Sequence, residues 1–205
     1  DLDSEMTVVR NELERNENNP GSVLGQRLRS TAYLWHNYGN TTIGARSDVE
    51  HVPIERLQAF YRTWYQPDNA VLIVAGRFDA AKVLATIQAK FGALKKPSRA
   101  LPVAYTAAPT QDGEREIAVR RSGDIRITSL AYHVPAATHA DTPALIVLGN
   151  ILSHVPGGRL HKALVDTKLA ASAGGGSGAT HDPGTFNFAM VVPKDGDATR
   201  AEAEL

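Results

Sequence analysis

Residues 53–76, PIERLQAFYRTWYQPDNAVLIVAG, carry a predicted helix, a stop and an apolar strand in immediate succession. After Pro53 the apolar side chains recur at helical spacing, which favours a helix with one face in the core. The side chains on that face are Ile54, Leu57, Phe60, Tyr61 and Trp64. The run 66–69 then stops the helix. The apolar segment 70–75 predicts a strand buried on both faces, because its β-branched content disfavours a helix.

Upstream of this stretch the sequence predicts two more helices. The first is expected over residues 4–16, and the second over 20–34, because Asn19 is a favourable cap and proline is tolerated at the first helical position. A turn is expected at 38–40. Residues 41–52 lack a helical period, so we expect a loop there.

Downstream, Asp79 predicts the cap of a helix over residues 80–91. The composition then changes, because residues 97–113 contain three prolines and no helical period. Such a segment is typical of a linker. We therefore expect a domain boundary at 97–113, with residues 1–96 on one side and 114–205 on the other.

The second half of the chain also mixes strands and helices, so the predicted fold class is α+β. We expect a hairpin of strands 116–121 and 125–134, helices over 142–154, 159–167 and 198–205, and strands over 170–173 and 186–192. Residues 174–178 are rich in glycine but are not followed by the Lys-Ser or Lys-Thr of a phosphate-binding loop. We expect a flexible loop there.

Composition excludes several classes of function. Lysine plus arginine and aspartate plus glutamate number 22 each, so no net field favours nucleic acid or an anionic membrane. No apolar run approaches the roughly 20 residues that span a bilayer. The chain has no cysteine, so any metal must be held by histidine, glutamate or aspartate.

Two glutamates occupy an unusual position in the first predicted helix. At about 100° per residue, Glu5 and Glu12 fall inside the apolar arc of that helix. The arc is formed by Met6, Val8, Val9 and Leu13. A buried carboxylate costs several kcal/mol unless it is neutralised, hydrogen-bonded or bound to a cation. One carboxylate on a metal and one orienting another ligand would satisfy this spacing. Alternatively, both lie at the edge of the arc and pair with arginine or lysine.

The run 5–13, EMTVVRNEL, resembles the segment that supplies the third zinc ligand in the pitrilysin/insulinase family of inverted zincins, which includes mitochondrial processing peptidase. Further stretches are similar to that family and occur in the same order. They are residues 36–39, 43–44, 48–50, 60–61, 64–69, 71–76, 148–152, 158–160 and 162–164.

This resemblance implies metallopeptidase-type domain halves, each a sheet covered by helices. It implies a zinc site made by an HxxEH helix and a glutamate from a later helix, where zinc activates a water and the glutamate of HxxEH is the general base. By position, Glu12 matches the third zinc ligand, and Glu5 matches a carboxylate that hydrogen-bonds around the site. No HxxEH occurs in this chain. The two histidine ligands and the catalytic base are therefore expected upstream of it.

The resemblance also implies that the chain is an internal fragment of a longer parent protein. Residues 1–96 would be the rear half of its zinc-site domain, and 114–205 the front half of the next domain. The parent is expected to be a zinc endopeptidase that hydrolyses peptides or small unfolded proteins, while the fragment alone is expected to be inactive. Similarity to bacterial members favours a periplasmic address.

Two other functions stay open on the sequence. One is a non-catalytic family domain that packs against an active peptidase partner. The other is an unrelated binding module. For the endopeptidase and for the non-catalytic family domain, the expected partners are peptide substrates and the remaining domains of the parent or a paired subunit. Neither nucleic acid nor a membrane span is expected.

Overall fold

The computed structural model describes residues 2–205, which divide into two compact units. One unit comprises the residues up to Arg10 together with Ala45–Tyr105, and the other comprises Asn11–Gly44 together with Thr106–Leu205. The fold is α+β, as predicted: helices combine with one small antiparallel sheet. Among the residues described, no helix is both long and apolar enough to cross a membrane.

The first two predicted helices are confirmed. Helix α1 runs from Leu2 to Asn18, and α2 from Pro20 to Ala32. The side chain of Asn19 accepts a hydrogen bond from the backbone N–H of Ser22 at 3.0 Å, which satisfies one of the free donors at the start of α2. A 3₁₀ turn, η1, follows at Asn37–Gly39.

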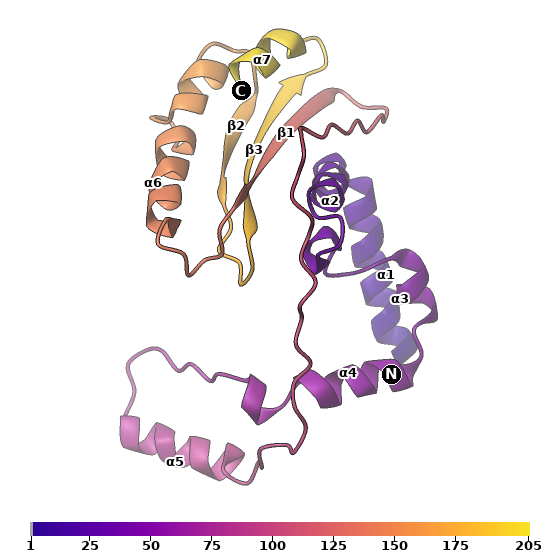
Figure 1. Ribbon diagram of the computed structural model, residues 1–205, viewed down its shortest axis with the longest axis vertical. Coiled ribbons are helices and arrows are strands. Elements are labelled where there is room, and N and C mark those ends of the chain that lie inside the picture. The colour runs from indigo at the N-terminus through magenta and orange to yellow at the C-terminus, as the bar shows by residue number, and fades with distance from the viewer. Residues whose placement is uncertain (1) are drawn as a thin grey trace. The chain divides into compact units, whose positions relative to one another are not determined.

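The second unit is built around a three-stranded antiparallel sheet in the order β1-β3-β2 (Figure 1). Strand β1 is Ile125–Val134, β2 is Ser172–Ser177 and β3 is Gly184–Pro193. The central strand β3 pairs with β1 along its whole length, from Gly184 opposite Val134 to Pro193 opposite Ile125. Strand β2 pairs with the other edge of β3.

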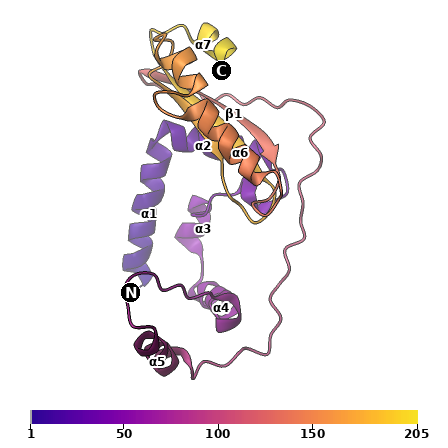
Figure 2. The same ribbon diagram turned by 90° about the vertical axis from the view of Figure 1, so that its left-hand side faces the viewer.

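Helix α6, Thr142–Ser153, lies against one face of this sheet (Figures 1 and 2). Side chains at alternating positions of β3 point to that side, and Phe186, Met190 and Val192 are buried, as period-2 alternation predicts. Helix α2 lies on the other face, where a Cβ added at its Gly21 would come within 3.8 Å of Ile127 on β1.

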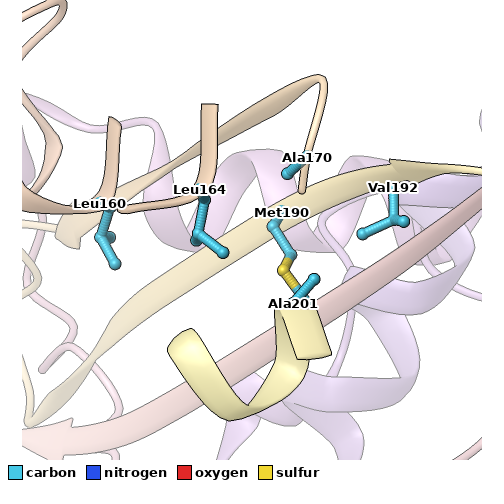
Figure 3. Close-up of a cluster of buried hydrophobic side chains, with 6 residues drawn as sticks. All are labelled: Leu160, Leu164, Ala170, Met190, Val192 and Ala201. Carbon is cyan, nitrogen blue, oxygen red and sulfur yellow. The ribbon is translucent and has the colours of Figure 1, made fainter. Parts of the chain in front are cut away.

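One end of the sheet holds the main hydrophobic core (Figure 3). The short π-helix η3, His161–Val165, and helix α7, Ala198–Glu204, cover β3 there. Six buried side chains form the cluster: Leu160, Leu164, Ala170, Met190, Val192 and Ala201. Leu164 has no exposed surface, so it contributes the full hydrophobic free energy of a leucine side chain.

The first unit contains helices α3 at Arg46–His51, α4 at Ile54–Trp64 and α5 at Ala80–Phe91, with a 3₁₀ turn, η2, at Pro67–Asn69. The side chain of Asp79 accepts a hydrogen bond from the backbone N–H of Lys82 at 3.1 Å, which confirms the predicted cap. Arg99 donates two hydrogen bonds to Asp68, at 2.9 and 3.3 Å. This bidentate pair ties the segment after α5 to η2.

The prediction of a buried strand at residues 70–75 is wrong for this structure. The segment has no strand pairing, and its side chains are exposed, with Val71 at 87% and Ile73 at 82%. The apolar face of α4 is also exposed, for example at Phe60. A strand buried on both faces needs paired neighbours and two covering layers, and the residues described supply neither to this segment.

Three further local predictions are wrong. Residues 116–121 form no strand; in the part of the chain that the structure describes, β1 is an edge strand paired with β3 alone. Residues 46–51 are the helix α3, which is too short to carry a recognisable apolar period. The glycine-rich stretch 174–176 is not a loop but lies in β2. Its composition reflects the close approach of the neighbouring backbone, because a Cβ on Gly175 would collide with the carbonyl oxygen of Asn187.

Candidate functional site

Helix α1 carries both glutamates that the sequence analysis singled out. Glu5 and Glu12 are exposed. The prediction that they lie on a core-facing side of the helix is therefore wrong, because no residue that the structure describes buries them. The apolar arc beside them is only partly covered: Leu13 is buried at 5% exposure, whereas Val8 is 60% exposed. Since an exposed carboxylate stays hydrated, neither glutamate carries the desolvation cost that a buried position would impose.

The residues described do not by themselves fit a zinc ion. Among residues 2–205, no group of three histidine, aspartate or glutamate side chains is close enough to hold a metal, and the chain has no cysteine. A catalytic zinc site takes three protein ligands and a water. Glu12 could supply one of these ligands and Glu5 could orient another, so both assignments stay predictions about a site completed from outside the chain.

We therefore expect residues 1–205 alone neither to bind zinc tightly nor to cleave peptides, because one carboxylate cannot replace a three-ligand site. Calorimetric titration with zinc and a peptide-hydrolysis assay on the isolated chain measure this. One-to-one binding with a submicromolar dissociation constant would contradict it, and would mean that the chain assembles a site from residues we have not identified.

The structure assembles a polar cluster that the sequence analysis did not predict. It joins the segment after α2 to the turn between β2 and β3, both within the second unit. His36 Nε2 lies 3.2 Å from Asp182 Oδ2, the hydroxyl of Tyr38 accepts a hydrogen bond from the backbone N–H of Asp182 at 3.1 Å, and the hydroxyl of Tyr33 donates to the carbonyl of Pro183 at 3.1 Å. These contacts fix the turn against the helical segment.

Both ring nitrogens of His36 are engaged in this cluster. Its Nδ1 accepts a hydrogen bond from the backbone N–H of Tyr38 at 3.1 Å, so Nε2 carries the proton and donates to Asp182. A histidine held in this way has no free nitrogen with which to act as a general base. The pair is therefore a positioning element for the turn and not a catalytic dyad.

The electrostatics of the cluster agree with this role. The hydrogen bond from His181 is the largest effect and lowers the pKa of the Asp182 carboxyl; burial opposes it, and the hydrogen bond from His36 adds a weaker lowering. Because the pKa in the folded state is lowered, the stabilisation is present above the ordinary pKa and is lost as the pH falls through the lowered one. Burial raises the pKa of the Tyr33 hydroxyl, which keeps it protonated as a donor.

Sequence reasoning missed this cluster because its members lie far apart in the chain. Tyr33, His36 and Tyr38 are about 150 residues from Asp182, and no local period connects them. The one local signal is the stretch 36–39, HNYG, which predicts a turn and resembles the family segment but does not indicate Asp182 as a partner.

Comparison with known proteins identifies the family of this chain. The profile described as the peptidase M16 inactive domain matches residues 51–205, most of the chain. The chain belongs to this family. The match begins after Glu5 and Glu12, so it does not test their assignment. The family resemblance seen in the sequence is confirmed, and an origin as an unrelated binding module is excluded.

Relatives of the M16 chain are named as proteases. It is 34% identical over 160 residues to the zinc protease PqqE of Helicobacter pylori, covering 77% of this chain and 36% of that protein. A crystal structure of a protease from Helicobacter pylori superposes with a TM-score of 0.93 at 31% identity, over 99% of this chain and 50% of that chain. The peptidase M16 inactive domain from Pseudomonas fluorescens shares the fold, with a TM-score of 0.80 at 18% identity over the same shares of the two chains.

The M16 chain thus spans about half the length of the two solved structures and about a third of the curated relative.

Proposed function

We propose that this chain is part of a zinc-dependent endopeptidase, to which it contributes Glu12 as a zinc ligand and Glu5 as a carboxylate that hydrogen-bonds around the site. The observation that carries the proposal is membership of the M16 family together with a 34% identical relative named as a zinc protease. Peptides or small unfolded proteins are the proposed substrates. The histidine ligands and the general base would come from the rest of the parent protein.

The surface of α1 supports this role for the glutamates. Glu5 and Glu12 are exposed next to Val8, which leaves 60% of its surface uncovered. Such a mixed apolar and acidic face favours a covering layer, because exposed apolar area is stabilised by burial. A carboxylate that becomes covered needs a cation or a hydrogen-bond donor. A zinc ion with its histidine ligands would provide both.

The exposed apolar side chains of the first unit support the proposed domain division. Residues 1–96 would form the rear half of the zinc-site domain, residues 97–113 the linker, and residues 114–205 the front half of the following domain. The extended segment 70–75 offers unpaired backbone groups and highly exposed Val71 and Ile73. These features are typical of a strand that pairs with neighbours from another part of a protein.

A specific observation favours a second candidate, a non-catalytic domain that packs against an active peptidase. The matching profile describes an inactive domain, and no metal-binding group occurs among residues 2–205. In this alternative the parent or a paired subunit provides the complete active site, and Glu5 and Glu12 act only in packing.

Metal dependence of the intact parent protein distinguishes the two candidates. We expect the purified parent to contain about one zinc per chain and to hydrolyse an unstructured peptide, because a complete site holds one ion. Removal of zinc with a chelator should abolish hydrolysis, and added zinc should restore it. A parent that contains no zinc and cleaves nothing unless a partner subunit is added would support the non-catalytic alternative instead.

A further inference from the structure

A cavity of about 450 Å³ opens beside the polar cluster, within the second unit. Its wall is formed by the end of α2, the segment that follows it, the turn between β2 and β3 and the start of β3. Arg29, Asn37, Tyr38, Asn40 and Thr42 are among the residues that line it. Neither the proposed zinc site nor the packing of α1 uses this cavity.

The charge of the cavity is unbalanced. Arg29 is the one charged residue in its wall, which contains no aspartate, glutamate, lysine or histidine. Among residues 2–205, no carboxylate forms an ion pair with Arg29. The carboxylate of Asp182, which does not line the cavity, is engaged by His36 and His181. Arg29 is exposed, so its five guanidinium N–H donors are open to an anionic ligand that enters the cavity.

Tyr38 adds a donor whose direction is fixed. Its hydroxyl oxygen accepts the backbone N–H of Asp182, so the hydroxyl proton is left to donate to a ligand. The ring is held edge-on to His36 and Tyr33, with centroids 4.5 and 5.7 Å away. Because neighbouring rings hold it in place, this donor costs little conformational entropy on binding.

Neutral donors complete the wall. The side chains of Asn37, Asn40 and Thr42 line the cavity and are exposed, and their amide and hydroxyl groups bond to no other side chain in the part of the chain that the structure describes, so a ligand can reach them. One cation surrounded by neutral donors matches a ligand group that carries a single negative charge. A phosphate, with nearly two charges at neutral pH, more often takes several cations or a helix N-terminus.

We propose that this cavity binds a carboxylate group of a peptide, with Arg29 as its charge partner and the Tyr38 hydroxyl as a second donor. The carboxylate can belong to the C-terminus of the peptide or to an acidic side chain. The inference concerns binding alone and does not rest on the proposed zinc chemistry.

The test uses the intact parent protein after zinc has been removed with a chelator, so that no peptide is cleaved. Three alanine-rich hexapeptides, labelled with fluorescein at the N-terminus, are titrated and followed by fluorescence anisotropy. One has a free C-terminal carboxylate, one a C-terminal amide, and one a C-terminal amide preceded by glutamate. We expect the free acid to bind at least about 10-fold more tightly than the plain amide, because charge-assisted hydrogen bonds are the stronger class.

The outcomes with the three peptides separate the two sources of the carboxylate. Tight binding of the free acid alone assigns the cavity to peptide C-termini, whereas equal binding of the glutamate amide assigns it to carboxylates in general. Equal affinity for the free acid and the plain amide, or no binding of any peptide, would overturn the proposal.

Variants locate the binding at the cavity. Arg29→Gln should weaken binding of the free acid about 10-fold or more, Arg29→Lys less, and Tyr38→Phe by a smaller factor, since it keeps the ring but loses the hydroxyl. Arg27→Gln is the matched control, because Arg27 is exposed on α2 but does not line the cavity. Each variant should retain the circular dichroism spectrum of the parent. Unchanged affinity in a folded Arg29→Gln would rule out the cavity as the site.

Discussion

Glu12→Gln in the intact parent protein is expected to reduce both zinc content and peptide hydrolysis to background. The substitution keeps the size of the side chain but removes the anionic oxygen that a zinc ligand must supply. Glu12 is exposed on α1, so the change should leave the fold intact. Metal content by atomic absorption and the rate of peptide cleavage are measured on the same preparation, together with its circular dichroism spectrum.

Substitutions of two other glutamates on α1 serve as a comparison and a control for Glu12→Gln. Glu5→Gln should keep zinc at saturating metal and lose about 10- to 100-fold in affinity or rate, as expected for a group that orients a ligand. Glu14→Gln is the control, because Glu14 is exposed and lies about 200° around the helix from Glu12. Equal, near-wild-type zinc in Glu12→Gln and Glu14→Gln would remove the ligand assignment and leave the non-catalytic alternative.

Gly175→Ala should lower the free energy of unfolding by about 3 kcal/mol, at the upper end of overpacking effects. Gly175 pairs with Phe188 in the sheet, and its new Cβ would collide with the carbonyl oxygen of Asn187 and lie 2.7 Å from the Cα of Phe188. Both are backbone atoms of the central strand, so no side-chain rotation relieves the clash. Urea denaturation followed by circular dichroism measures the loss.

The adjacent glycine provides a matched control. A Cβ at Gly176 would meet no atom within 4 Å, so Gly176→Ala should be neutral or stabilise by up to about 1 kcal/mol through the entropy of the unfolded chain. Similar effects of the two substitutions would mean that β2 does not pair with β3 in the register described.

Most helices of this protein, though not the short α3, were predictable because short-range interactions determine where they begin. Asn19 with Pro20 and Asp79 mark helix starts through hydrogen bonds to backbone groups within three residues. The apolar spacing after Pro53 likewise predicts α4 correctly. Family membership was also predictable from the sequence, because the order and spacing of short motifs can be read without knowing how the chain packs.

Strand partners could not be read from the sequence. Strand β1 could have paired with residues 116–121 across a short turn, yet it pairs with β3, which begins 50 residues after β1 ends. Pairing at that distance depends on which faces can be buried together, and local propensity does not encode it. The same limit applies to residues 70–75, whose apolar composition predicts burial while the surrounding residues of this chain leave them exposed.

The sequence by itself determined where α2 and α5 begin, the absence of thiolate chemistry and the presence of two glutamates on one helix, because each depends on residue type and near neighbours. The tertiary structure decided that Glu5 and Glu12 are exposed, that glycines 174–176 form a strand, and that His36, Tyr38 and Asp182 meet beside a cavity lined by Arg29. These features join residues far apart in the chain. They form only when the favourable free energy of apolar burial and strand pairing exceeds the entropy cost of bringing those segments together.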